Sequence, residues 1–239
     1  MKRTARRVLI LSAALVALAA CAVALFFVSR SRDFQFFGGL VSSVPNGENE
    51  IALTFDDGPT ENTSAILETL AALDVKATFF LCGAAIEERP EDARAIAEAG
   101  HAIGNHSYSH RRMVLKSYGY VKDEVDRTSA LIRESGYEGE IFFRPPYGKK
   151  LFTLPCYLNQ ISMVTAMWSV EPETELGYGA SPEAIADAVL ESVESGSIIL
   201  LHPMYNPENV LAALDIIVPA LRARGYVFAT LPELCAAGK

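Results

Sequence analysis

The hydropathy pattern divides the chain into an apolar N-terminal run and a longer part in which apolar and polar positions alternate. Residues 8–28 form an unbroken run of low polarity, preceded by basic residues at positions 2, 3, 6 and 7. As a helix, a run of this length spans the hydrocarbon core of a bilayer, which is ~30 Å thick. Because a basic flank stays in the cytoplasm, residues 1–32 are expected to form a single-pass signal anchor that places the rest of the chain outside the cytoplasm.

Two alternatives for the N-terminus stay open. Leu18-Ala-Ala-Cys21 resembles the attachment motif of lipoproteins, in which Cys21 carries the lipid, although residues 22–28 stay apolar. A secreted protein would lose the segment by cleavage, which usually follows a shorter apolar run that ends in small residues. With an anchor, residues 33–49 are expected to be a tether to a domain at residues 50–239.

From residue 51 onward, short apolar runs alternate with amphipathic stretches of helical period. The pattern predicts strands at residues 51–55, 77–81, 102–104, 141–143, 162–168, 197–201 and 226–229. It predicts helices at residues 60–73, 90–99, 118–134, 181–195 and 209–224, with residues 150–160 irregular. Such alternation indicates a parallel α/β sheet, open or closed, and about seven strands suit a slightly short barrel.

Polar residues with reactive side chains come shortly after several of the predicted strands. In chain order they are Asp56, Asp57, His106, Arg144, Glu171 and His202. In parallel barrels the active site gathers at the carboxyl ends of the strands. Independent segments of the chain therefore predict one shared site.

Charge and cysteine content narrow the classes of function. The first 32 residues hold six basic residues and no acidic one, so the remainder carries a net charge of −14 against −8 for the whole chain. A body this acidic disfavours nucleic acid and suits a neutral glycan better than an anionic polymer. The four cysteines form no CxxC pair, Cys82 is expected to be buried, and the pairing of Cys156 with Cys235 stays open.

Histidines and acids supply a candidate metal site. His106 and His110 are four residues apart, so on a helical turn or a tight loop both rings can grip one metal ion. Two histidines and one aspartate leave open coordination positions, which suits a catalytic zinc. Neighbouring strand residues point to opposite sides, so one of Asp56 and Asp57 is expected to join the metal while the other faces the reacting water. His101 has no partner at a useful spacing and is expected to be structural.

Two further segments carry candidate catalytic groups. Arg144-Pro-Pro-Tyr-Gly148 combines a cation at a strand end with a stiff loop, although an ordinary proline-rich turn has the same composition. The cation can orient an acid, and a backbone N–H of the loop can stabilise an oxyanion. His202 follows the apolar run at residues 198–201, so its position at a strand end favours a role in the site.

Four segments then combine into a family pattern. They are Thr54-Phe-Asp-Asp-Gly-Pro59, His106-Ser-Tyr-Ser-His110, Arg144-Pro-Pro-Tyr-Gly148 and Leu200-Leu-His202. In this order they resemble the motifs of the polysaccharide deacetylases, the NodB-homology domain of carbohydrate esterase family 4, over residues 50–234. The resemblance implies an α/β fold, a distorted (β/α) barrel with about seven parallel strands.

The resemblance also implies a metal site. Asp57, His106 and His110 are expected to bind a divalent metal, usually Zn²⁺, with Co²⁺ or Ni²⁺ as alternatives. Such a metal polarises the carbonyl group of an amide and favours ionisation of water near neutral pH. Both effects address the weak electrophilicity of an amide.

Four further roles follow from the same resemblance. Asp56 is expected to be the general base that deprotonates the attacking water, and Arg144 is expected to orient Asp56. The backbone amide of Tyr147 is expected to stabilise the oxyanion. His202 is expected to be the general acid that protonates the departing amine.

The chain departs from the family pattern after Trp168. The family usually has an Asp-x-x-Asp-Trp pattern there, whereas this chain reads Ser169-Val-Glu171-Pro-Glu173-Thr-Glu175. Glu171 or Glu173 can replace the acid that tunes the general-acid histidine, with a longer side chain. Loss of the family tryptophan removes an expected wall for stacking against a sugar, so the departure bears on substrate preference.

The expected function is metal-dependent removal of N-acetyl groups from an N-acetylglucosamine polysaccharide, such as peptidoglycan, a chitin-like polymer or poly-N-acetylglucosamine, at the cell envelope. The alternatives are a non-catalytic carbohydrate-binding protein on the same fold and a deacetylase of O-acetylated, xylan-type substrates. A metalloprotease is disfavoured because the chain has no His-Glu-x-x-His. The expected partners are the polysaccharide and the membrane, and the sequence does not determine the oligomeric state.

Overall fold

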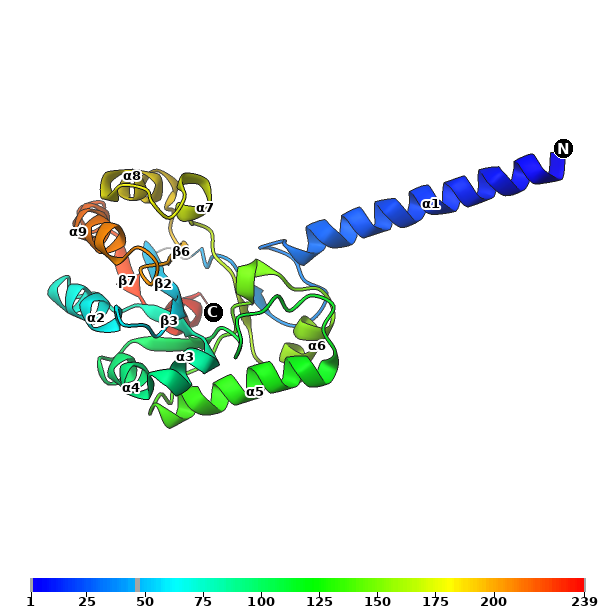
Figure 1. The fold of residues 1–239 in the computed structure, drawn as a ribbon. Coiled ribbons are helices and arrows are strands. Elements are labelled where there is room, and N and C mark those ends of the chain that lie inside the picture. Colours follow the sequence, from blue (N-terminus) through cyan, green and yellow to red (C-terminus); the bar gives the residue numbers. More distant parts are fainter. Residues whose placement is uncertain (1, 46–47, 239) are drawn as a thin grey trace.

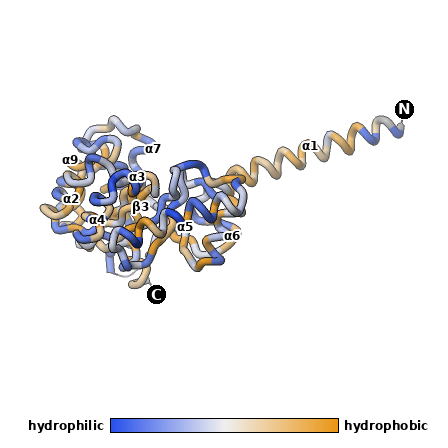
Figure 2. Tube along the Cα trace, turned by 60° about the horizontal axis from the view of Figure 1, so that its bottom comes forward, coloured by the Kyte–Doolittle hydropathy of each residue, from blue (hydrophilic) through white to orange (hydrophobic). Residues whose placement is uncertain are grey.

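A computed structural model describes residues 2–45 and 48–238; Met1, residues 46–47 and Lys239, which belong to the expected anchor, tether and domain, lie outside the described residues. Helix α1 (Lys2–Ser29) projects away from the rest of the molecule (Figure 1). Its segment Ala5–Ser29 is the one described helix that is long and apolar enough to cross a membrane. The most apolar part of this segment has a mean hydropathy of 2.8, and none of it is buried. Figure 2 shows apolar residues along most of its length. The segment is therefore not a core helix, and an anchor or a signal remains consistent with it.

The main sheet contains five parallel strands, and β2 (Glu50–Gly58) pairs with three of the others. The order is β4-β3-β2-β6, and β7 also pairs with β2. The neighbouring strands are β3 (Thr78–Leu81), β4 (Ala102–Asn105), β6 (Ile198–Leu201) and β7 (Val227–Ala229). In β6, Ile199 and Leu201 belong to one buried apolar cluster, whereas Ile198 and Leu200 belong to another on the opposite face. Burial on both faces explains the continuous apolar run of this strand.

A second, smaller sheet pairs β1 (Leu40–Val41) with β5 (Thr165–Ala166), also in parallel. Single parallel bridges join Asn105 to Phe143 and Phe143 to Thr165, and another joins Val170 to Ile199 in β6. The parallel α/β fold is confirmed, whereas closure into a barrel rests only on these isolated bridges. Strand β1 lies inside the range expected as a tether, and the division at residues 32 and 49 stays a prediction.

Helices surround the sheet and cover its outer face (Figure 1). Helix α8 packs on α9, α2 on α4, and α3 on α5, while the C-terminal α10 packs beside β2. Their bounds are α2 (Thr63–Ala72), α3 (Gly83–Glu88), α4 (Pro90–Glu98), α5 (Tyr118–Glu134), α6 (Thr153–Gln160), α7 (Glu173–Leu176), α8 (Pro182–Ser192), α9 (Pro207–Ala223) and α10 (Leu231–Ala237). Ser181 caps α8 as its sequence predicts, because its side chain accepts a hydrogen bond from the Ala184 amide.

Two predicted elements differ in the structure. Residues 141–143 contribute two isolated bridges, both at Phe143, instead of a strand. Residues 150–160, expected to be irregular, contain helix α6, which buries Leu154, Tyr157 and Leu158 at helical spacing. Pro155 hides this pattern, although a proline is tolerated in the first turn of a helix. Cys156 in this helix is a free thiol, so the disulfide between Cys156 and Cys235 that the sequence left open is not formed.

Candidate active site

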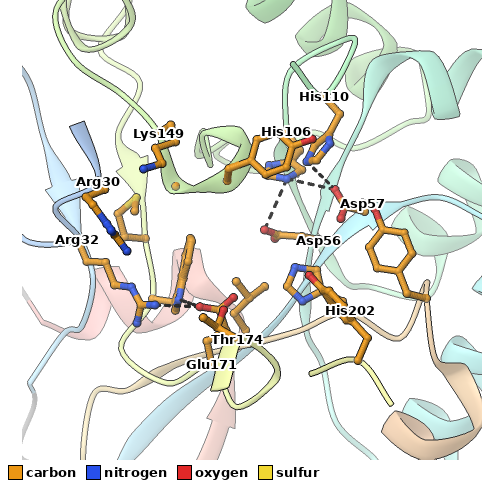
Figure 3. A pocket seen from close by; sticks show the side chains of 17 residues that line it. Arg30, Arg32, Asp56, Asp57, His106, His110, Lys149, Glu171, Thr174 and His202 are labelled. Carbon is orange, nitrogen blue, oxygen red and sulfur yellow. Dashed lines mark hydrogen bonds and ion pairs between the residues drawn. The ribbon is translucent and has the colours of Figure 1, made fainter. Parts of the chain in front are cut away.

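The two acids at the end of β2 face the same pocket. The pairing of β2 with β3 shifts register between Phe55 and Gly58, and Asp57 has a left-handed φ of 69°. Both Asp56 and Asp57 consequently line one pocket (Figure 3). The prediction that strand alternation points them to opposite sides is wrong, because regular alternation stops before Asp57.

The paired histidines follow β4 on a loop and approach Asp57. His106 Nε2 lies 3.4 Å and His110 Nε2 3.0 Å from Asp57 Oδ1. One potential ligand atom from each of the three residues lies within 4.8 Å of the others. Positive φ values of 65° at Ser107 and 53° at His110 fold the loop back, so the pair belongs to a tight loop and not to a helical turn.

Buried side chains hold this loop in place. Glu124 of α5 accepts hydrogen bonds from the backbone N–H groups of Tyr108 (2.9 Å) and Ser109 (2.8 Å). Asn105, fully buried at the end of β4, accepts a hydrogen bond of 2.9 Å from the N–H of Ser107. Each contact satisfies a backbone donor that would otherwise be unpaired in a strained loop. Together they fix the separation of the two histidines.

The donor set fits a divalent metal. Asp57 Oδ1 is buried and has no hydrogen-bond partner among the described residues. His106 Nδ1 lies 2.8 Å from the carbonyl oxygen of Arg144, so Nδ1 carries the proton and Nε2 is left facing Asp57. Metal-binding histidines are typically oriented by such a bond from the other ring nitrogen. Two imidazoles and a carboxylate form a ligand set that suits Zn²⁺ and leaves coordination positions open.

Electrostatics at this end of the pocket favour a cation. Burial alone raises the pKa of Asp57, but the close approach and the charges of His106 and His110 hold that pKa well below its usual range. Burial lowers the pKa of His106, whereas the charge of Asp56 and contacts with Asp57 outweigh burial and raise it. A bound metal would replace these protons, because ligand groups bind metals in their deprotonated form.

Arg144 lies behind the pocket and contacts Asp56 directly. Its guanidinium is fully buried, and Nη1 donates hydrogen bonds of 2.8 Å to Asp56 Oδ1 and to Thr54 Oγ1. Nη2 donates to the carbonyl of Met167 at 3.0 Å, and the guanidinium stacks 3.9 Å above the ring of Phe80. Burial lowers the pKa of Arg144, and the charge of Asp56 opposes this effect. The contacts fix one carboxylate oxygen of Asp56 and leave the other facing the pocket.

His202, at the end of β6, pairs with an acid from the segment that departs from the family pattern. Its Nδ1 lies 2.6 Å from Glu173 Oε2, and both side chains are buried. Burial lowers the pKa of His202, but the hydrogen bond to Glu173 and the charges of Asp56 and Asp57 raise it overall. Of the two acids left open by the sequence, Glu173 is thus the partner of His202. Glu171 instead accepts a hydrogen bond of 2.7 Å from Trp168 Nε1.

Three half-exposed tyrosines give the pocket its aromatic surface. Tyr147, Tyr178 and Tyr205 are 57%, 51% and 58% exposed, and all line the pocket. Tyr178 packs edge-on against His202 with ring centroids 5.5 Å apart. Tyr147 has a left-handed φ of 58°, which turns the proline-rich loop into the pocket. These rings offer surfaces on which a sugar can stack, whereas the sequence predicted the loss of one such surface with the family tryptophan. Trp168 itself is almost entirely buried.

The pocket has a volume of about 630 Å³ and contains six of the seven predicted site residues, with Arg144 directly behind it. Sequence reasoning missed Tyr178, Tyr205 and three cations, Arg30, Arg32 and Lys149, at the opposite end (Figure 3). The tyrosines lie within six residues of Glu173 and His202, which is a usable signal. The cations belong to no motif.

His101 lies outside this site, as expected. Its Nδ1 accepts a hydrogen bond of 3.2 Å from the Ala77 amide, and its ring packs against Phe79. Burial, aided by the charge of Lys76, lowers the pKa of His101 to about 4. A neutral, buried ring that joins two strands has a structural role.

Comparison with known proteins identifies the family. The family model described as polysaccharide deacetylase matches residues 43–165. A peptidoglycan-N-acetylglucosamine deacetylase of Bacillus cereus (strain ATCC 14579) is 38% identical over 196 residues, which cover 80% of this chain and 70% of that protein. A chitooligosaccharide deacetylase of Sinorhizobium fredii is 34% identical over 200 residues, which cover 78% and 92% of the two chains.

A solved structure agrees with these matches. The crystal structure of a peptidoglycan N-acetylglucosamine deacetylase superposes with a TM-score of 0.76 at 35% identity, covering 81% of this chain and 91% of the other. The chain therefore belongs to the polysaccharide deacetylase family, the hydrolases of carbohydrate esterase family 4. The family and the enzyme class expected from the four sequence motifs are confirmed.

Proposed function

We propose that this protein is a metal-dependent deacetylase that hydrolyses N-acetyl groups of an N-acetylglucosamine polysaccharide at the cell envelope. The observation that carries the proposal is the convergence of Asp57, His106 and His110 with Asp56 and His202 on a single pocket. The named activities of the relatives, on peptidoglycan and on chitooligosaccharide, support the same reaction.

In this proposal Asp57, His106 and His110 hold the metal. A divalent ion such as Zn²⁺, with Co²⁺ or Ni²⁺ as alternatives, supplies polarisation of the amide carbonyl and favours ionisation of water. Asp56 takes a proton from the attacking water. Its bond to Arg144 at 2.8 Å fixes the carboxylate, so the free oxygen needs no reorientation to act as a base.

Departure of the amine requires a proton on its nitrogen. His202 supplies it, because its raised pKa keeps a larger share of the imidazole protonated near neutral pH. Glu173 holds the proton on Nδ1 and directs Nε2 into the pocket. The backbone amide of Tyr147 donates a hydrogen bond to the developing oxyanion. The products are acetate and a glycan with a free amine.

The proposed location follows from helix α1. A signal anchor at residues 1–32 would hold the domain at residues 50–239 outside the cytoplasm, within reach of wall polysaccharide. Its apolar surface is unburied in this structure, which supports insertion into a bilayer. Lipid attachment at Cys21 or cleavage would each be detected by the mass of the mature chain.

Acetate release tests the function. The full-length protein in detergent is incubated with peptidoglycan, chitooligosaccharide, poly-N-acetylglucosamine and acetylxylan, each with Zn²⁺ and each after chelation. We expect acetate from at least one N-acetylated glycan with Zn²⁺ and loss of that activity on chelation. Acetate from acetylxylan alone, or from no substrate with Zn²⁺, Co²⁺ or Ni²⁺ supplied, contradicts the proposal.

A further inference from the structure

The pocket has a second end, opposite the metal ligands, that is lined by cations. Arg30, Arg32 and Lys149 line it, and Figure 3 shows them across the pocket from Asp57, His110 and His202. Two of the three come from the segment that directly follows helix α1. Residues at the C-terminal end of the expected anchor segment thus form part of the wall of the catalytic pocket.

This segment is fastened to the catalytic domain. The Arg32 guanidinium forms an ion pair of 2.9 Å with Glu171 and stacks over the ring of Trp168 at 4.8 Å. The backbone N–H of Lys150 donates a hydrogen bond of 2.9 Å to the carbonyl of Ser29, and the buried Lys150 ammonium donates to the carbonyl of Ser31. These contacts on both sides of Arg30 hold it at the pocket.

Arg30 and Lys149 carry positive charge that no described acid neutralises. Arg32 has Glu171 as its partner, whereas neither Arg30 nor Lys149 forms an ion pair within the described part of the chain. Both pack on the same ring, with the Arg30 guanidinium 5.7 Å and the Lys149 ammonium 4.9 Å from the centre of Phe26. Burial, followed by repulsion from Arg30 and Arg112, lowers the pKa of Lys149. Adjacent cations of this kind are stabilised by a shared anion.

We propose that Arg30 and Lys149 form an anion-binding subsite for a carboxylate on the glycan, next to the sugar that loses its acetyl group. The inference rests on the proposed function and names its substrate class, an N-acetylated glycan that also bears carboxylates. It reverses the expectation of a neutral glycan drawn from net charge, because local charge in the pocket decides recognition where substrate binds.

The arrangement of charge in the pocket favours a glycan over a lipid headgroup. Arg30 and Lys149 line the same continuous cavity as Asp56 and His202, and this cavity of about 630 Å³ has room for several sugar rings. Its other end is acidic and takes a cation. A carboxylate bound at Arg30 and Lys149 therefore orients the glycan along the pocket in one direction only.

The test compares two tetrasaccharides of equal length with full-length protein in nanodiscs of neutral lipid. One alternates N-acetylglucosamine with a carboxylate-bearing sugar, and the other is neutral chitotetraose. For wild type we expect a higher kcat/KM on the acidic glycan. The Arg30→Gln/Lys149→Gln variant should lower the ratio of kcat/KM on the acidic glycan to kcat/KM on the neutral glycan about tenfold. Arg30→Gln alone, which leaves the turn at residues 145–148 unaltered, should lower this ratio about threefold.

The matched control is Arg94→Gln, which removes one exposed charge on α4 outside the pocket. It should leave the ratio unchanged. An unchanged ratio in the double variant overturns the proposal, whether kcat/KM stays the same on both glycans or falls equally on both. A double variant that changes only in nanodiscs with anionic lipid assigns the cations to lipid headgroups and overturns it as well.

A binding measurement separates this inference from the proposed function. Calorimetric titration of the chelated protein with the acidic tetrasaccharide should give a Kd about tenfold weaker for the double variant than for wild type. Failure of the deacetylase proposal shows as no acetate from either glycan. Failure of the subsite shows as equal Kd values, whatever the activity.

Discussion

The two ends of the pocket are built in different ways. At the metal-ligand end, Asp56, Asp57, His106 and His202 stand at the ends of strands β2, β4 and β6 of the main sheet. At the cationic end, Arg30, Arg32 and Lys149 stand on irregular segments from distant parts of the chain. A regular sheet can hold metal ligands and catalytic groups within a few ångströms of one another. Irregular segments joined by side-chain contacts are sufficient to place cations that bind a substrate.

The two ends also differ in charge. Carboxylates raise the pKa of His106 and of His202 above their usual values, against the effect of burial. At the other end, burial and neighbouring cations lower the pKa of Lys149. The acidic end suits a metal and proton transfer, and the basic end suits an anionic part of a substrate. Four substitutions test this division, beginning with the one that should reduce activity most.

Asp56→Asn should have the largest effect on activity. The amide keeps an acceptor for Arg144 but cannot take a proton, so kcat should fall about a thousandfold. Acetate release measures kcat, and thermal unfolding checks that the variant folds, because Arg144 loses a buried ionic partner. Asp187→Asn on the exposed side of α8 is the control. Activity equal to wild type would show that Asp56 is not the base.

Glu124→Ala should weaken the metal site without removing a ligand. It deletes the carboxylate that accepts hydrogen bonds from Tyr108 and Ser109, so the loop with both histidines loses its support. Zinc affinity, measured by competition with a chelator, should fall about tenfold. The neighbouring exposed residue provides the control Asp123→Ala. Unaltered zinc affinity would mean that the loop holds its shape without α5.

Glu173→Gln should shift the pH profile. In wild type the bond to Glu173 raises the pKa of His202, so the acid stays protonated to higher pH. Without the carboxylate that pKa falls, and the alkaline limb of kcat/KM should move to lower pH, with about a tenfold loss near neutral pH. Glu175→Gln, exposed on the same short helix, should not move the limb. A stationary limb in Glu173→Gln would exclude Glu173 as the group that tunes the acid.

Arg32→Gln should have the smallest effect. It removes an ion pair to Glu171 and a stack on Trp168, and the Arg32 side chain is 38% exposed. The free energy of unfolding should fall by about 1 kcal/mol. Denaturant unfolding in detergent measures this change against Arg94→Gln. No change would show that the contacts of Arg32 do not hold the segment after α1 on the domain.

Local signals explain what the sequence predicted. The continuous apolar run at residues 197–201 and the helical period over residues 118–134 are each visible within a short stretch of sequence, so both elements are found in the structure. The candidate metal ligands lie in two short motifs at strand ends, and a parallel sheet brings such ends to one edge. The conformation of Asp57 was missed because strand alternation was extended one residue too far.

Contacts between distant segments explain what the sequence did not predict. Arg32 and Glu171 are 139 residues apart, and no periodicity connects them. Glu124 of α5 accepts hydrogen bonds from the histidine loop, but the sequence of α5 predicts only an amphipathic helix and not this contact. The choice of Glu173 over Glu171 depends on the turn at α7, which places only Glu173 beside His202.

A metal titration shows whether activity depends on a metal held by Asp57, His106 and His110. Full-length protein is stripped with a chelator, and acetate release is followed as Zn²⁺ is added, in parallel with His110→Gln. We expect activity that rises to a plateau at one metal per chain in wild type, with zinc binding and activity both strongly reduced in His110→Gln. Activity in the stripped protein, or equal zinc binding by His110→Gln, would contradict this expectation.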